Sequence, residues 1–192
     1  MLEVRRVRYK VSRITAESEP VTVTEVAERL RLLPPSQDEL DYVIEPMITA
    51  AREYCEARAG YAFIQQEIEA YPDTEDLEAG IFYLPRPPVI TLDSVKAYGA
   101  DGTETSIEGC QFDEDGRFFF NAPGLPALRA VNPIGITYTA GADVCPESAK
   151  QAMLLLIGHW YQNRESVQTG AVTAVEIAQT TDALLKLFKR WW

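Results

Sequence analysis

The feature that most constrains the fold is a strand, a turn and an apolar helix that follow one another over residues 136–167. The stretch before Gly141 is rich in β-formers, and Pro146 suits the first position of a helix because its φ is already set. That helix is predicted to run to about Asn163. Apolar residues cover most of its circumference at helical spacing: Ala149, Ala152, Met153, Leu154, Leu155, Leu156, Ile157, Trp160 and Tyr161. Such a helix is buried between neighbours.

A first helix is predicted over residues 24–32. Thr22 and Glu25 have the spacing of a capping box at its start, and Pro34 and Pro35 end it.

Ser36 caps a second, longer helix, which Gly60 stops. Its apolar stripe consists of Leu40, Val43, Ile44, Met47, Ala51, Tyr54 and Cys55. Pro46 would cost roughly 3 kcal/mol in a regular helix interior. We therefore expect a kink there, or a helix that properly starts near Glu45.

The period changes to that of short strands over residues 61–139. Asp-Gly turns at 99–102 and 113–116 predict hairpins, and Pro85, Pro87 and Pro88 form a rigid connector. Strands are expected around residues 63–68, 81–84, 90–98, 103–107 and 117–120. A last amphipathic helix is predicted at 182–190.

The fold class is therefore α+β, with a helical core of three to four helices and a small antiparallel β-rich insert between the second and third helices. We expect a basic N-terminal arm (1–20), one domain (21–167) and a C-terminal arm (168–192). Within the domain, the helical core is 21–60 and 143–167, and the insert is 61–139.

Composition limits the class of protein. The 192 residues are 46% hydrophobic and 24% charged, enough for one sizeable core. No stretch approaches the roughly 20 apolar residues that span a bilayer, and no signal peptide is visible, so we expect a cytoplasmic protein. The three cysteines form no CxxC pair, which argues against disulfides and a zinc site.

Charge is divided unevenly along the chain. The net charge is −11, but the first twenty residues hold five cations against three acids, so the rest carries about −13. An acidic body repels DNA phosphates, which argues against sequence-specific nucleic-acid binding.

Catalytic candidates are few. His159 is the only histidine, so a histidine-based mechanism must use it. Cys145 lies about 20 Å from it along the same helix, too far for a thiolate pair. An acid-rich run over residues 67–78 reads as a solvated strand edge or loop rather than as a metal site. We predict no catalytic residue, cofactor or metal.

Three segments together resemble head-to-tail connector proteins of tailed bacteriophages. The central one, TAGADVCPESAKQAMLLLIGHWYQNRES, carries the turn and apolar helix described above. Residues 20–60 are similar to the opening helix pair of that family, and residues 84–102 are similar to its proline-led strand. The three segments occur in the order that the family has.

The resemblance implies a non-enzymatic structural protein of a phage or prophage particle. It would form a ring of about twelve copies under the portal protein, remain a monomer in isolation, and offer a platform for the next connector or tail-completion protein. Its expected place is the virion neck after assembly in the host cytoplasm. No membrane or sequence-specific nucleic acid is an expected partner.

A ring needs two different surface patches that meet on neighbouring copies. We predict an oligomer interface at Tyr42, Glu45, Arg52, Arg164 and Glu165. The C-terminal arm is predicted to dock on the portal through Leu184, Leu187, Phe188, Trp191 and Trp192, because tryptophan is enriched at binding hot spots. The competing interpretation is that this arm packs back on the core.

Two other functions stay open at this point. One is a small binding or scaffolding module that shares the helical core, and the other is a hydrolase that uses His159.

Overall fold

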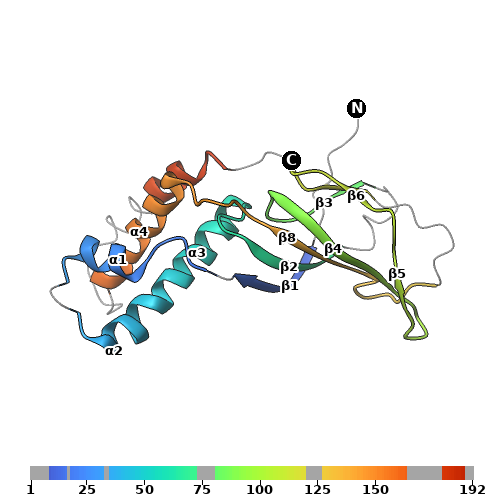
Figure 1. Ribbon diagram of the computed structural model, residues 1–192, viewed down its shortest axis with the longest axis horizontal. Coiled ribbons are helices and arrows are strands. Elements are labelled where there is room, and N and C mark those ends of the chain that lie inside the picture. Colours follow the sequence, from blue (N-terminus) through green and yellow to red (C-terminus); the bar gives the residue numbers. More distant parts are fainter. Residues whose placement is uncertain are drawn as a thin grey trace. The chain divides into compact units, whose positions relative to one another are not determined.

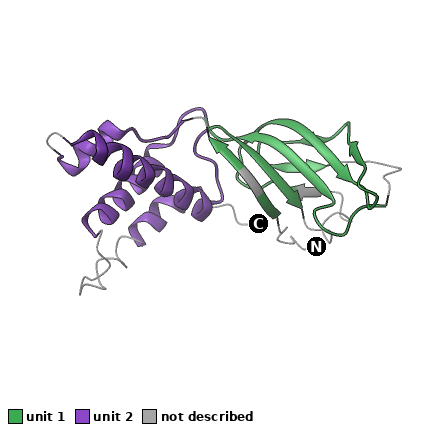
Figure 2. Ribbon diagram, turned by 90° about the horizontal axis from the view of Figure 1, so that it is seen from below, with its two compact units in different colours: residues 1–17, 65–142, 191–192 green, residues 18–64, 143–190 purple. Residues whose placement is uncertain are grey.

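The computed structural model describes residues 9–16, 18–32, 35–72, 81–119, 127–163 and 179–188. Helices and antiparallel strands are both present, which confirms the predicted α+β class (Figure 1). The chain divides into two compact units (Figure 2). The sheet unit is residues 1–17, 65–142 and 191–192, and the helical unit is residues 18–64 and 143–190.

The sheet unit contains a five-stranded antiparallel sheet in the order β1-β2-β8-β4-β5. These strands are β1 (Tyr9–Ala16), β2 (Gln66–Pro72), β8 (Ile134–Ala140), β4 (Val89–Tyr98) and β5 (Glu104–Ser106). A second sheet has the order β3-β7-β6, from β3 (Ile81–Tyr83), β7 (Arg117–Phe119) and β6 (Gln111–Phe112).

The central strands β2 and β8 separate apolar from polar side chains by strict alternation. Ile68 lies opposite Tyr138, and Ala70 opposite Ile136, and all four side chains are buried. The residues between them are glutamates on β2 and threonines on β8, which are more accessible. Such alternation is what a sheet with one covered face requires.

Both predicted hairpin turns are confirmed. Residues 99–102 join β4 to β5, where Gly99 N–H donates to the Thr103 carbonyl. Residues 113–116 join β6 to β7, and Gly116 closes that turn with φ +83°. The proline connector after β3 is fixed to strand β8 by a hydrogen bond, in which the buried Tyr138 hydroxyl donates to the Pro85 carbonyl.

Strand β1 was not predicted. It comes from the segment that the sequence analysis assigned to a basic arm, and it pairs along its length with β2. The predicted domain boundaries themselves stay predictions.

The helical unit begins with α1 (Val23–Leu30), whose predicted capping box is present. The Thr22 hydroxyl accepts from Glu25 N–H, and the Glu25 carboxylate accepts from Thr22 N–H. Ser36 caps α2 (Gln37–Glu39) in the predicted manner.

Pro46 has the effect expected from its chemistry. A π-helix, η1 (Leu40–Ile44), leads into α3 (Glu45–Ala59), and Pro46 falls in the first turn of α3. The backbone stays helical from η1 into α3, so Pro46 does not mark a separate helix start. Glu45 N–H donates to the Leu40 carbonyl, five residues back, and this π-helical spacing accommodates a following residue that has no N–H. Gly60 ends α3 in the left-handed conformation.

Helix α4 (Glu147–Gln162) packs against α3 and α1. Pro146 is its N-cap with extended backbone, so the prediction that Pro146 is the first helical residue was wrong by one position. Its buried face consists of Ala149, Ala152, Met153, Leu156 and Ile157. Among the described residues, no helix is both long enough and apolar enough to cross a bilayer.

Within the described residues, 179–185 are helical and 186–188 form a turn, so part of the helix predicted at 182–190 is present. Thr181 and Leu185, one turn apart, are the two buried residues of this segment. Tyr54 also differs from its prediction: it belongs to the predicted apolar stripe of α3 but is partly exposed.

Candidate assembly interface

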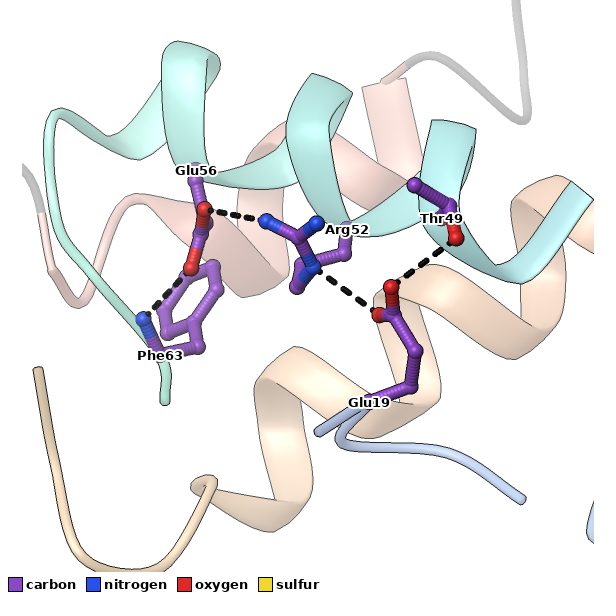
Figure 3. A network of polar contacts seen from close by, with 5 residues as sticks. All are labelled: Glu19, Thr49, Arg52, Glu56 and Phe63. Atoms are coloured by element: carbon purple, nitrogen blue, oxygen red, sulfur yellow. Dashed lines mark hydrogen bonds and ion pairs between the residues drawn. The ribbon is translucent and has the colours of Figure 1, made fainter. Parts of the chain in front are cut away.

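A network of charged and polar groups lies inside the helical unit (Figure 3). Arg52 on α3 is only 5% exposed, and Glu56, one turn later, is fully buried. Arg52 Nε lies 2.9 Å from Glu19 Oε2, and Arg52 Nη1 lies 3.2 Å from Glu56 Oε2.

The other oxygens of both carboxylates are also satisfied. Thr49 Oγ1 donates to Glu19 Oε1 at 2.9 Å, and Phe63 N–H donates to Glu56 Oε1 at 2.9 Å. Burial alone lowers the pKa of Arg52, but the hydrogen bonds and charges of Glu19 and Glu56 outweigh it, so the pKa is raised. Arg52 pairs with Glu19 in the segment before α1 and with Glu56 on its own helix, and Glu56 in turn holds the segment after α3 through Phe63 N–H.

This position changes the interpretation of Arg52. A guanidinium enclosed by two carboxylates of its own chain has little to offer a neighbouring copy, which argues against Arg52 as an interface residue. Glu19, Thr49 and Glu56 were missed. The signal was the four-residue spacing of Ile48, Arg52 and Glu56, which places both charges in line with a buried isoleucine.

Tyr42 and Glu45, in contrast, face outward. Tyr42 on η1 is 78% exposed and Glu45 at the start of α3 is exposed. They occupy the region where the π-helix meets Pro46, and π-helical turns are frequent at functional sites. Arg164 and Glu165 lie outside the described residues.

The described part of the C-terminal arm packs on the helical unit. The Phe188 ring lies 5.1 Å from that of Phe63 and 5.5 Å from that of Tyr61, measured between centroids. Arg58 and Asp182 form an ion pair. Residues 179–188 therefore agree with the competing interpretation of an arm that folds back.

Not all of this arm is covered. Leu184 and Phe188 are half-buried, but Leu187 is 76% exposed. Trp191 and Trp192 lie outside the described residues. Among the predicted docking residues that the structure describes, Leu187 is the one that offers most of its side chain to a partner.

His159 has a local structural role. Its backbone carbonyl accepts from both the main-chain and the side-chain N–H groups of Asn163, which ends α4. The Asn163 side-chain nitrogen also lies 3.0 Å from His159 Nδ1. These contacts give the imidazole a helix-capping partner rather than a nucleophile.

The cysteines of the helical unit are buried thiols. Burial, with the nearby Glu56 and Cys145, raises the pKa of Cys55 to about 12. Burial is also the main cause that raises the pKa of Cys145 to about 11. The described residues contain no group of three histidine, cysteine or acidic side chains placed to hold a metal ion.

A comparison with protein-family models identifies one family. The family model for head completion protein matches residues 19–184. No curated protein matches the chain in sequence.

Solved structures with the same fold come from gene transfer agent (GTA) particles. A chain in the virion of a native GTA particle has a TM-score of 0.67 at 22% identity, over 93% of this chain and 96% of that chain. A chain in the neck of an empty GTA particle with C6 symmetry has a TM-score of 0.65 at 21% identity, over 94% and 96%. A chain in the neck of a native GTA particle with C12 symmetry has a TM-score of 0.64 at 21% identity, over 95% and 96%.

The family match covers both units of the fold and most of the sequence, in keeping with the resemblance that three segments of the sequence showed. This chain belongs to the head completion protein family, a family of structural head-to-tail connectors.

Proposed function

We propose that this chain forms a ring in the neck of a phage-like particle, between the portal protein and the next connector or tail-completion protein. The observation that carries the proposal is the family match over residues 19–184. The likeness to chains in GTA necks of six-fold and twelve-fold symmetry supports a ring of about twelve copies.

The role is structural rather than enzymatic. The half-buried His159 caps α4 through Asn163, and the thiols of Cys55 and Cys145 are buried with raised pKa values. These groups have structural tasks, and none is paired as a nucleophile with a base among the residues that the structure describes. The protein assembles in the host cytoplasm and ends in the virion neck.

Side contacts in the ring use the exposed surface at Tyr42 and Glu45, with Arg164 and Glu165, which follow in the sequence after α4, as further members. An exposed tyrosine is a favourable anchor because it buries a large area with few rotamers to order. Arg52 is left out of this proposed surface because it is buried between Glu19 and Glu56 of its own subunit.

The portal contact uses Leu187 and the terminal tryptophans, Trp191 and Trp192. Leu184 and Phe188 belong to the segment of residues 179–188, which packs on the helical unit, so their role is to anchor this segment and not to contact the portal. A truncation after Phe188 separates the two roles, because it leaves the packed segment of residues 179–188 intact.

The test is co-expression of this chain with the portal protein of its own particle, followed by electron microscopy. We expect an additional ring on the portal, and we expect truncation after Phe188 to abolish that ring while the unfolding midpoint in urea stays unchanged. A scaffolding module without a connector role would bind other components without adding a symmetric ring. Normal ring formation by the truncated chain would contradict the portal-docking role of the tryptophans.

A further inference from the structure

The two edges of the five-stranded sheet differ in charge. Among the described residues, strand β1 forms one edge of this sheet and β5 forms the other. The sequence of β1, YKVSRITA, contains Lys10 and Arg13 and no acid. Exposed acids surround β5 instead: Asp101 and Glu104 at its start and Glu108 just after it.

We propose that neighbouring copies join through these edges, with β1 of one copy beside β5 of the next, so that the sheet continues around the ring. This inference rests on the proposed ring. The occupant of each edge is a second copy of this chain.

The exposure of the edge strands supports this contact. All three residues of β5 are exposed on both faces, although the strand pairs with β4. Edge strands present unpaired main-chain N–H and C=O groups, which natural proteins cover or charge to prevent uncontrolled pairing. Strand addition satisfies these groups and gives affinity through main-chain hydrogen bonds.

The charges select which edges can meet. The sequence of β1 carries cations and no acid, so two β1 edges would bring like charges together. Two β5 edges would bring acids together, and like charges across an interface are costly. A β1 edge beside a β5 edge brings opposite charges together. The pairing is therefore head-to-tail, which is the type of contact that a closed ring requires.

The irregularity of β1 is compatible with a short contact. A bulge between Val11 and Arg13 divides the strand into two regular halves. Because β5 has only three residues, one half of β1 is long enough to pair with it.

Strand spacing gives the scale of such a ring. Five strands at ~4.8 Å advance about 24 Å per copy. With twelve copies, the symmetry of one GTA neck, the path through the sheets would measure about 90 Å across.

Disulfide trapping tests the proposal on rings assembled with the portal protein. The background is Cys110→Ser, because Cys110 is the half-buried cysteine. Lys10 pairs with Tyr71 on β2, and Ser106 pairs with Lys96 on β4. The register across β2, β8 and β4 places Tyr71 and Lys96 on the same face of the sheet, so Lys10 and Ser106 share that face. Two double variants cover the two halves of β1: Lys10→Cys with Ser106→Cys, and Thr15→Cys with Ser106→Cys.

After oxidation, we expect one of the two double variants to give a ladder of covalent multimers on a denaturing gel. Each single variant should give only the monomer band. Glu28→Cys with Ser106→Cys is the control, because Glu28 is exposed on α1. Rings that form normally but give no ladder with either double would overturn the inference and leave the proposed function intact. Absence of rings from the parent chain would instead refute the proposed function.

Charge reversal gives an independent readout of ring occupancy on the portal. Lys10→Glu and Glu104→Lys should each reduce occupancy about tenfold, and the double reversal should restore it. Glu28→Lys, with the same change in net charge as Glu104→Lys, should leave occupancy unchanged. Equal loss in the double reversal and the singles would contradict edge pairing.

Discussion

The helical unit and the sheet unit bury polar groups in different ways. The described helical unit encloses Arg52 and Glu56 in a charged network that joins three stretches of chain. The sheet unit keeps its charges on accessible positions of the alternating strands, and Gln66 is its one buried polar side chain among the described residues. The helical unit therefore depends on a few specific charged pairs in addition to its apolar core, whereas the sheet unit relies on the alternation along its strands.

The largest expected effect comes from Arg52. Arg52→Met leaves the fully buried Glu56 carboxylate without its cation, which should lower the free energy of unfolding by about 3–5 kcal/mol. Urea unfolding measures the change. Arg52→Met with Glu56→Gln should recover part of the loss, because the uncompensated charge is gone; a double variant that is less stable than Arg52→Met would contradict this account.

The next effect lies in the sheet unit at Gly135. A Cβ there would lie 3.1 Å from ring atoms of both Tyr71 and Tyr98. Gly135→Ala should therefore cost about 1–3 kcal/mol, as overpacking does.

Gly158 on α4 is the matched control in the helical unit. A Cβ at this position meets nothing within 4 Å, so Gly158→Ala should stabilise the protein by about 1 kcal/mol through helix propensity. Urea unfolding of both variants gives the comparison. The same sign of change in the two variants would show that the packing argument fails at one of them.

Sequence reasoning succeeded where structure depends on neighbours along the chain. The caps at Thr22 and Ser36 and the hairpin turns follow from residues within about four positions of each other. Local hydrogen bonds and fixed φ angles decide these features, so the sequence pattern was sufficient.

The sequence pattern was insufficient where segments that are distant along the chain come together. Strand β1 pairs with β2, fifty or more residues later in the chain, and the sequence pattern of β1 alone does not indicate which strand it pairs with. Arg52 looked like a surface charge because its partner Glu19 is 33 residues away. Of the predicted interface, Tyr42 and Glu45 do lie exposed, but whether they touch a neighbouring copy stays a prediction.

A smaller effect is expected at the capping box. Thr22→Ala should cost about 1 kcal/mol. Hydrogen bonds from the backbone and side chain of Thr22 lower the pKa of Glu25 from its ordinary value of 4.5. Its stabilising contribution is therefore present above pH 4.5 and is lost as the pH falls through the lowered pKa.

The pH dependence has its own test. The stability difference between the parent chain and Glu25→Gln should be full at neutral pH and shrink in acid. Glu28→Gln, on the same helix, is the control. A difference that grows on acidification would have the wrong sign for a carboxylate with a lowered pKa.

The smallest effect concerns thiol reactivity and not stability. At pH 8, Cys110 in the sheet unit should react with iodoacetamide before Cys55 and Cys145, which are buried and whose pKa values are raised to about 12 and about 11. Mass spectrometry of the alkylated protein gives the order. In Arg52→Met the two buried thiols should react faster, because the helical unit opens more often. An unchanged rate would show that the Arg52 network does not control how often this unit opens.

The most direct measurement of the central claim is electron microscopy of particles that contain this chain, with the two units fitted into the neck density. We predict a closed ring of this chain directly below the portal, with about twelve copies and with each copy's β1 beside the next copy's β5. Particles whose neck contains the portal and the tail components but no ring of this chain would contradict the assignment of this protein as a connector.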